Sequence, residues 1–238
     1  MSNRHGLVDT IIDSLAPVNR DGHKFIAIAA GLALIFFLVW PPLAWVFVIV
    51  ALYIAYFFRD PDRVTPLREG LIIAPADGRI AAIETVTPPI ETGLGPEPRV
   101  RISTFLSVLD VHITRAPVAG RVVRSIYIPG AFLNAADDKA SDENERRTMI
   151  IQKADGSEIA VVQIAGLIAR RIVPFVHEGD TVAVGERLGL IRFGSRVDVY
   201  LPVGVVPLVG EGQTAFAGET VLADFAGSEL AVRMFRGI

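Results

Sequence analysis

The longest stretch without a charged residue runs from Phe25 to Phe58. Pro41 and Pro42 divide it into two halves, each shorter than the ~20 apolar residues of a membrane-spanning helix, whereas the whole stretch is longer than one span. Because proline breaks a helix, the pattern predicts a membrane-associated helical hairpin, or a helix pair lying shallowly in one leaflet. The alternative is a helix pair buried in a protein core, but uncharged runs of this length are rare in soluble domains.

Positive charges flank both ends of this apolar stretch. Arg20 and Lys24 precede it, and Arg59 and Arg63 follow it. Since Lys and Arg accumulate on the cytoplasmic side of membrane segments, both ends are expected at the cytoplasmic face of the cell membrane. Residues 1–24 are a polar lead without the pattern of a secretory signal.

Beyond the hairpin the apolar runs become short and are separated by Gly and Pro, which is typical of β-rich domains. We therefore divide the chain into an N-terminal region, 1–58, and a domain of residues 59–238, which is long enough for its own core. The predicted fold class is mainly β (α+β). Pro88–Pro98 and the polar segment Ala131–Arg147 are expected to be loops, the second of them ordered. Strands are expected at Ile72–Ile73, Ile80–Ile83, Val100–Phe105, Arg121–Ile128, Thr148–Ile151, Ile159–Ile164, Leu188–Ile191 and, with alternating apolar positions, Val197–Leu201.

A short phrase of sequence occurs twice in the β-rich domain. Ala74–Ile80 is echoed by Ala116–Val122, and Val176–Leu188 has the turn–strand–turn pattern of biotinyl- and lipoyl-type barrel-sandwich hybrids. That likeness concerns the fold alone. Such carriers modify a lysine at a hairpin tip, and no lysine follows Lys153, which argues against a carrier role.

Composition sets three further limits. The 238 residues are 51% hydrophobic with a mean hydropathy of +0.46, which agrees with a membrane segment. A net charge of −3 and a pI near 5.8 offer no basic field, so no nucleic-acid partner is expected. The chain has no cysteine, and only His112 and His177 lie in the β-rich domain, so we expect no metal site.

The pair Gly194-Ser195 stands between two apolar runs. Glycine leaves its carbonyl unshielded and tolerates unusual backbone angles. A serine hydroxyl beside a strained, exposed carbonyl is a site at which a chain can cleave itself. Taken alone, however, Gly-Ser is also a common turn sequence.

Two further residues are candidates for proton chemistry. His112, between Asp110 and Arg115, can accept or donate a proton at neutral pH, or it is a hydrogen-bonded structural histidine. Asp77 can orient a histidine or a hydroxyl group, or it is an ordinary turn residue before glycine. His177 precedes a Glu-Gly-Asp turn and is interpreted as structural.

Six short motifs follow one another along the chain: Phe57-Phe58-Arg59-Asp60-Pro61, Ala74-Pro75-Ala76-Asp77-Gly78, Phe105-Leu106 with Asp110-Val111-His112, Ala116-Pro117 through Gly120, Asn144-Glu145-Arg146, and Phe193-Gly194-Ser195. In this order, and behind a membrane segment, they resemble the phosphatidylserine decarboxylases, in particular the short prokaryotic type. The resemblance covers the chain from about Phe25 to Leu201.

The resemblance implies a proenzyme that cuts itself between Gly194 and Ser195. Ser195 Oγ would attack the Gly194 carbonyl to form an ester, β-elimination would release the upstream chain, and loss of ammonia would leave a pyruvoyl group. Residues 1–194 would become the β chain and residues 195–238 the α chain, which together form a heterodimer. Higher oligomers are left open.

The resemblance also implies the reaction and the residues that carry it. The pyruvoyl group, with no metal and no PLP, would form a Schiff base with phosphatidylserine in the membrane, release carbon dioxide and yield phosphatidylethanolamine. His112 would be the base for cleavage, oriented by Asp77, and the candidate to reprotonate Cα. Arg115 or Arg196 would hold the lipid phosphate or the substrate carboxylate.

The chain departs from the family pattern at two positions. Longer members carry a second histidine where this chain has Arg115, so either His112 serves both cleavage and decarboxylation or another group takes one role. Phe193 stands where other members have leucine before the reacting Gly-Ser pair.

Two rival functions predict an uncut chain. One is a non-enzymatic, membrane-anchored β-sandwich adaptor, which does not need Ser195. The other is a serine hydrolase with Ser195 as a lasting nucleophile, but the chain lacks a Gly-x-Ser-x-Gly elbow there, since Ser195 is followed by Arg196 and Val197.

Overall fold

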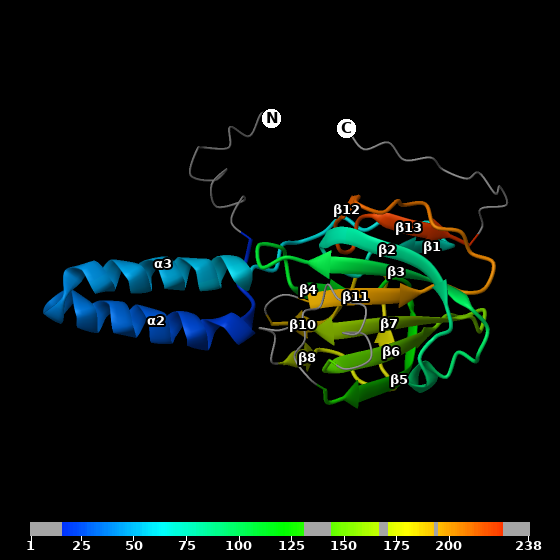
Figure 1. Ribbon diagram of the computed structural model, residues 1–238, viewed down its shortest axis with the longest axis horizontal. Coiled ribbons are helices and arrows are strands. Elements are labelled where there is room, and N and C mark those ends of the chain that lie inside the picture. Colours follow the sequence, from blue (N-terminus) through cyan, green and yellow to red (C-terminus); the bar gives the residue numbers. More distant parts are fainter. Residues whose placement is uncertain (1–15, 131–143, 167–170, 193–194, 226–238) are drawn as a thin grey trace, which may run out of the picture. The chain divides into compact units, whose positions relative to one another are not determined.

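The computed structural model describes residues 16–130, 144–166, 171–192 and 195–225. The chain divides into two compact units, Met1–Asp62 and Arg63–Ile238, which we treat separately. The first unit is helical and the second is built of strands (Figure 1). The predicted class, mainly β (α+β) with an N-terminal helical hairpin, is confirmed.

The helical unit consists of α2 (Arg20–Val39) and α3 (Pro41–Phe57), joined at Trp40. The break falls at the predicted Pro-Pro pair, where proline is tolerated in the first turn of the second helix. The first helix begins before the uncharged run does, because Asn19 Oδ1 caps it by accepting the Asp21 N–H at 3.1 Å.

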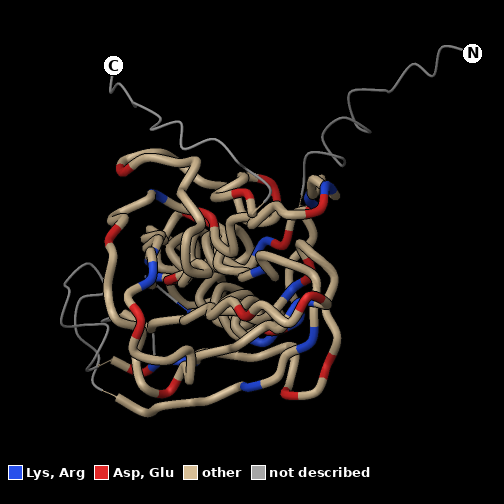
Figure 2. The backbone as a smooth tube through the Cα atoms, turned by 90° about the vertical axis from the view of Figure 1, so that its right-hand side faces the viewer, with Lys and Arg blue, Asp and Glu red and all other residues tan. Residues whose placement is uncertain are grey.

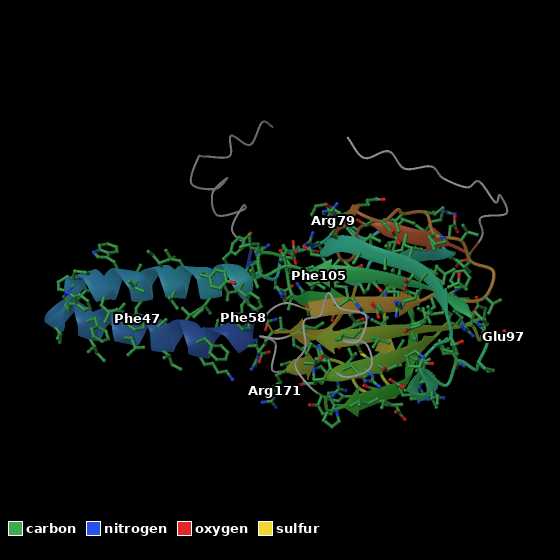
Figure 3. All side chains as sticks on the ribbon, viewed as in Figure 1. Phe47, Phe58, Arg79, Glu97, Phe105 and Arg171 are labelled. Atoms are coloured by element: carbon green, nitrogen blue, oxygen red, sulfur yellow. The ribbon has the colours of Figure 1, made fainter. Side chains whose placement is uncertain are left out.

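The hairpin presents apolar side chains outward. The buried residues of its two helices are mostly small: Gly22, Ala29, Ala33, Ala44 and Phe57. Many of the long apolar side chains drawn in Figure 3 are exposed, with Leu38 at 90%, whereas the Phe36 and Phe47 rings stack on each other. This exposure favours a membrane-associated hairpin over a helix pair buried in a protein core. The first helix is long and apolar enough to cross a membrane, and the second is shorter.

The β-rich unit contains three sheets in its described residues. The large sheet, which curls in Figure 1, has the order β12-β2-β3-β11-β7-β6-β5-β9, and the smaller ones have the orders β4-β10-β8 and β1-β13. The elements are β1 (Leu71–Ile73), β2 (Gly78–Val86), η1 (Ile90–Thr92), β3 (Arg99–Leu106), β4 (Ile113–Arg115), β5 (Gly120–Ile128), β6 (Arg146–Gln152), β7 (Glu158–Ala165), β8 (Ile172–Pro174), β9 (Thr181–Val182), β10 (Arg187–Ile191), β11 (Ser195–Tyr200), β12 (Thr214–Ala215) and β13 (Val221–Asp224).

Each predicted strand overlaps an observed one, whereas β4, β8, β9, β12 and β13 were not predicted. These strands are so short that alternation has too few positions to show. The loop prediction for Ala131–Arg147 is wrong at its end, because Arg146 and Arg147 pair with β7; residues 131–143 lie outside the described residues. The predicted loop Pro88–Pro98 contains the short helix η1. Basic and acidic positions are interspersed around the described part of this unit (Figure 2).

The β-rich unit is built from two structural repeats. Strand β1 pairs with β13 through Leu71↔Asp224, Ile72↔Ala223 and Ile73↔Val221, and β4 pairs with β10 through Ile113↔Leu190, Thr114↔Gly189 and Arg115↔Arg187. Both ladders are antiparallel, and both have a register irregularity at the same place. Strands β2 and β5 pair in the same way with the short strands β12 and β9.

The repeated sequence phrase marks the contact between the two repeats. The Ile73 N–H donates to the Pro117 carbonyl at 2.9 Å, and the Arg115 N–H donates to the Pro75 carbonyl at 2.8 Å. A Cβ on Gly78 would lie 2.1 Å from the Phe105 carbonyl oxygen, so only glycine fits there. The same holds for Gly120, whose Cβ would lie 2.3 Å from the Gln152 carbonyl oxygen. The likeness between 74–80 and 116–122 therefore reflects equivalent positions in three dimensions.

One repeat is inserted into the other. In repeat B, which runs from β4 to β10, the turn Lys153–Ser157 joins the paired strands β6 and β7. In repeat A, formed by β1–β3 and β11–β13, the equivalent strands β3 and β11 are joined by the whole of repeat B. The chain therefore crosses between repeats twice, once between β3 and β4 and once between β10 and β11. The first crossing ends at His112, and Ser195 directly follows the second.

Candidate active site

Ser195 is the first residue of β11 and is fully buried. It lies between Leu106 of β3 and Ala165 of β7, its register partners on either side. Its Oγ is buried and has no hydrogen-bond partner within the described residues. An unsatisfied buried hydroxyl costs free energy, and such groups in native structures often have a chemical role. Gly194, the other half of the predicted cleavage site, lies outside the described residues.

The Asn144-Glu145 pair fixes the strand beside Ser195. Asn144 Nδ2 donates to the Ala165 carbonyl at 2.8 Å, and the Ala165 N–H donates to the Glu145 carbonyl at 2.9 Å. Glu145 Oε1 also accepts the Ile172 N–H at 3.1 Å. Both side chains are buried, so this motif holds the end of β7 against the first residue of β11.

His112 is fully buried at the end of the first crossing. Its Nδ1 lies 2.9 Å from the backbone carbonyl oxygen of Asp110. Because a carbonyl oxygen can only accept, Nδ1 carries the proton in the neutral ring and Nε2 carries the lone pair. The Asp110 carboxylate stabilises the same turn, since its Oδ2 accepts the Ser107 N–H at 2.7 Å. The turn thus sets both the position and the tautomer of the imidazole.

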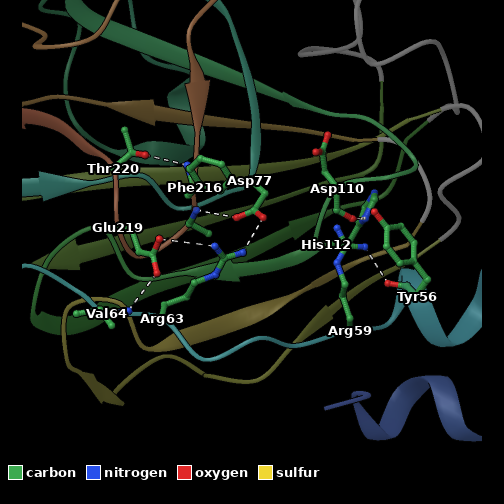
Figure 4. A network of polar contacts seen from close by, with 11 residues as sticks. Tyr56, Arg59, Arg63, Val64, Asp77, Asp110, His112, Phe216, Glu219 and Thr220 are labelled. Carbon is green, nitrogen blue, oxygen red and sulfur yellow. Dashed lines mark hydrogen bonds and ion pairs between the residues drawn. The ribbon is translucent and has the colours of Figure 1, made fainter. Parts of the chain in front are cut away.

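Asp77 lies just before β2 and is 6% exposed. Its Oδ1 accepts the Ala217 N–H at 2.8 Å, and its Oδ2 accepts a hydrogen bond from Arg63 Nη2 at 2.7 Å (Figure 4). Burial raises the pKa of the Asp77 carboxyl above its usual value, because desolvation disfavours the charged form. The hydrogen bond from Ala217 and the charge of Arg63 act in the opposite direction, and the nearby charge of Asp110 raises the pKa further.

Arg63 ties Asp77 to the segment that follows β12. Its Nη1 lies 3.8 Å from Glu219 Oε2, and Glu219 Oε1 accepts the Val64 N–H at 3.1 Å (Figure 4). The Arg63 side chain is 10% exposed, so its charge is partly desolvated and depends on these two carboxylates. The network fixes the position of the Asp77 carboxylate relative to the Ala217 backbone.

The two predicted substrate-binding arginines lie in different surroundings. Arg115 is buried and donates from Nη1 to the Gly185 carbonyl at 3.0 Å; with Arg63 and Arg187 it lines a cavity of about 590 Å³. Arg196 adjoins Ser195 in β11 and therefore points to the opposite face of the sheet. There it forms a buried ion pair with Asp198, with Nε 2.9 Å from Oδ1.

The alternation of polar and apolar residues in β11 does not correspond to exposed and buried positions. Every residue of this strand is buried, because both faces of the sheet are covered. His177 lies in an exposed turn, where its N–H donates to Asp180 Oδ2 at 2.8 Å. Among the described residues, no group of three or more histidine and acidic side chains is arranged to hold a metal ion.

The model of one protein family matches residues 50–223, and its description is phosphatidylserine decarboxylase. The chain belongs to the phosphatidylserine decarboxylase family. It is 55% identical over 222 residues to a phosphatidylserine decarboxylase proenzyme of Cereibacter sphaeroides, a match that covers 93% of this chain and 96% of the relative. It is also 55% identical over 211 residues to the protein of the same name from Nitrobacter winogradskyi, covering 89% and 85% of the two chains. The family inferred from the six motifs is confirmed.

The structure adds residues to the family motifs that the sequence had not marked. Arg63 follows the Arg59-Asp60-Pro61 motif, and its charge was considered only as a flank of the membrane segment. Asp110 lies inside the His112 motif but had been given no role. Arg63 contacts Asp77, which lies 14 residues away in the chain, and Asp110 contacts His112 through its backbone carbonyl. A sequence pattern reveals neither kind of contact.

Proposed function

We propose that this chain is the proenzyme of a phosphatidylserine decarboxylase that cuts itself between Gly194 and Ser195. The observation that carries the proposal is the buried, unsatisfied Ser195 hydroxyl at the junction of two repeats, in a chain of this family. A hydroxyl without a competing hydrogen bond is available to attack the preceding carbonyl. Among the described residues, Ser103, Thr104 and Thr148 also have buried hydroxyls without a partner, so it is the position of Ser195 after Gly194, in a chain of this family, that distinguishes it.

The surroundings of Ser195 fit the pyruvoyl group that the family implies. The site is closed by strand neighbours on both sides, and the serine oxygen makes no contact within the described residues that would be lost when the residue is converted. Once formed, the pyruvoyl group supplies a carbonyl that condenses with a primary amine and accepts the electrons left behind when carbon dioxide departs.

His112 is proposed as the proton-transfer group of both steps. Its Nδ1–H donates to the Asp110 carbonyl, so its Nε2 lone pair can take the proton from Ser195 Oγ as that oxygen attacks the Gly194 carbonyl. In turnover the protonated ring can return a proton to the substrate Cα. A single histidine that serves both steps accounts for the arginine at position 115.

Asp77 is proposed to act on His112 through its charge and through the frame around it. Its two oxygens are held by Arg63 and by the Ala217 backbone, so the carboxylate is fixed in place. Such a fixed negative charge would favour the protonated ring that forms during cleavage. The tautomer itself is set by the Asp110 carbonyl, so orientation and charge come from different residues.

Arg115 is the better candidate for binding the substrate phosphate or carboxylate. It lines a cavity together with two other arginines, and its guanidinium can form two parallel hydrogen bonds to a phosphate or carboxylate. Arg196, although proposed for the same role from the sequence, has its charge paired with Asp198 on the opposite face. We therefore propose a structural role for Arg196.

The sheet supports a heterodimer of the cut chains. Strand β11 opens the α chain, 195–238, and pairs along its length with β3 and β7 of the β chain, 1–194. Strands β12 and β13 also pair with strands of the β chain. The two chains would thus remain joined through several ladders after the cut. The substrate would be drawn from the membrane at the cytoplasmic face, where positive charges flank the hairpin.

The intact mass of the purified protein tests this proposal. The decarboxylase requires two chains that meet at 194/195, with the smaller one blocked at its N-terminus by the pyruvoyl group. The adaptor and the serine hydrolase both require one uncut chain of 25.7 kDa. An uncut chain without activity on phosphatidylserine would overturn the proposal.

A further inference from the structure

Another cavity lies within the β-rich unit, beside the arginine-lined one. Its volume is about 570 Å³, and its lining includes Gly70, Ala119, Lys153, Val184 and Phe225. Val184 lines both cavities, and none of the five is a candidate catalytic residue. Their positions in the two repeats, however, relate the cavity directly to the candidate active site.

The residues that line this cavity occupy positions equivalent to those of the candidate active site in the other repeat. The Phe225 N–H donates to the Gly70 carbonyl at 2.7 Å, just as the Ile191 N–H donates to the His112 carbonyl at 3.1 Å, so Gly70 is the counterpart of His112. Ala119 precedes the glycine that opens β5, as Asp77 precedes the glycine that opens β2.

The remaining positions correspond in the same way. Val184 and Ala217 lie in equivalent turns, each directly before the glycine that contacts an Ala-Pro turn: Gly185 donates to the Ala116 carbonyl and Gly218 to the Ala74 carbonyl, both at 2.8 Å. The cavity is therefore the twin of the candidate site. It is formed by the same backbone framework with different side chains.

The twin cavity lacks counterparts of the two candidate proton-transfer residues. Glycine and alanine stand at the positions of His112 and Asp77. The counterpart of Ser195 is Ser157, which also follows a glycine, but its Oγ lies 2.5 Å from Asp155 Oδ1 and is thereby satisfied. This framework can thus enclose a ligand without performing the chemistry of the candidate site.

The lining of the twin cavity offers charges of both signs beside an apolar wall. Lys153 Nζ lies 3.9 Å from the centre of the Phe225 ring and 2.8 Å from Asp155 Oδ2. Arg68, which is 60% exposed, pairs with Asp224, and Leu67 and Leu71 add apolar surface. A phosphodiester that carries a primary amine matches this set, because its phosphate can bind the cations while its amine binds a carboxylate or the aromatic face.

We propose that the twin cavity is a second, non-catalytic site for the headgroup of an aminophospholipid. The inference rests on the proposed function, since that function makes such a headgroup the ligand of the equivalent framework. The ligand is inferred to be a lipid of the membrane. Binding of a free phosphate ester instead is an outcome that the test distinguishes. A site of this kind would let the enzyme bind its lipid without converting it.

The test uses the full-length protein in detergent with Phe225→Trp, which keeps an aromatic ring beside Lys153 and reports on the cavity. Tryptophan emission is followed during titration with glycerophosphoethanolamine, and the parent chain with only Trp40 and Trp45 supplies the background. We expect a saturable change that is at least about tenfold weaker in affinity after Lys153→Ala and unaffected by Asp77→Ala. Ala154→Leu, which fills the cavity without removing a charge, should weaken binding as well.

Parallel titrations separate the ligand sources. Vesicles containing phosphatidylethanolamine should produce the change, whereas inorganic phosphate or ethanolamine alone should not. A change in emission with phosphate alone, or the absence of a saturable change, overturns the second site. A change that is lost with Asp77→Ala but kept with Lys153→Ala overturns it as well. Chain cleavage is measured in the same preparation of the parent protein. A cut chain without a headgroup response refutes only the second site, and an uncut chain with one refutes only the proposed function.

Discussion

The backbone carbonyl of Asp110 accepts a hydrogen bond from Nδ1 of His112 at 2.9 Å. The contact spans two residues of the chain segment that crosses from one repeat to the other. It places the proton of the neutral, buried imidazole on Nδ1 and the lone pair on Nε2. The carboxylate of the same aspartate holds the turn through the Ser107 N–H, so one residue controls the histidine through two different groups.

Replacing Asp110 should slow self-cleavage through this turn. Asp110→Ala removes the acceptor for the Ser107 N–H and loosens the carbonyl that holds His112, so we expect cleavage to slow by about 10- to 100-fold. Asp110→Asn retains an acceptor oxygen and should restore most of the rate. The measurement is the fraction of cut chain with time after synthesis. If the alanine variant cleaves at the parent rate, the turn does not position His112.

The two serines that follow glycine at equivalent positions provide a matched comparison. Ser195→Ala removes the attacking oxygen, so we expect an uncut chain without decarboxylase activity. Ser157→Ala changes the equivalent residue of the other repeat, whose hydroxyl is bound to Asp155, and should leave cleavage at 194/195 unchanged. Gel analysis and intact mass check both. Cleavage in the Ser195 variant would contradict the pyruvoyl assignment.

Asn144 is expected to matter for both stability and cleavage. Asn144→Ala leaves the buried Ala165 carbonyl without its side-chain donor and should lower the free energy of unfolding by about 1–3 kcal/mol. Cleavage should slow as well, because Ala165 is the strand partner of Ser195. Gln152→Ala, on the same strand ladder but partly exposed, serves as the control and should change either property little. Equal effects of the two substitutions would argue against a specific role.

The raised pKa of Asp77 predicts a pH dependence of stability. Its value in the unfolded chain is near 3.8 and its value in the folded protein is higher, so the folded state binds the proton more tightly. The stability gained from this proton is fully present below pH 3.8 and is lost as the pH rises through the folded pKa.

Asp77→Asn removes that titration. The free energy of unfolding is measured with denaturant in a Ser195→Ala background, which keeps the chains uncut. As the pH rises from 3.8 through the folded pKa of Asp77, the parent should lose stability relative to the Asn variant. A stability difference that is constant with pH, or that grows in favour of the parent, would show that burial is not the dominant influence on this carboxyl.

Arg115 provides a test of substrate binding. Arg115→Lys keeps a positive charge but loses the planar fork of the guanidinium, so KM for phosphatidylserine should rise by about tenfold with a smaller change in kcat. Arg187→Lys, which changes another arginine of the same cavity, shows whether the effect is specific. An unchanged KM in the Arg115 variant would exclude this arginine from headgroup binding.

The sequence by itself determined the hairpin, the β-rich class and the family, and it supplied Gly194-Ser195 as the candidate cleavage site. These features depend on local patterns: an uncharged run broken by proline, short apolar runs between Gly and Pro, and motifs of neighbouring residues. It also contained the repeated Ala-Pro motif, but not the fact that the motif marks two structural repeats. The shortest strands were not predicted, because two to four residues are too few to show an alternation.

Only the tertiary structure decided what surrounds Ser195. Register between distant strands places Ser195 between Leu106 and Ala165 and turns Arg196 to the opposite face of the sheet. Insertion of one repeat into the other brings His112 and Ser195 to the two crossings. Such relations depend on hydrogen bonds between segments far apart in the chain, and no local period of polar and apolar residues encodes which segments meet.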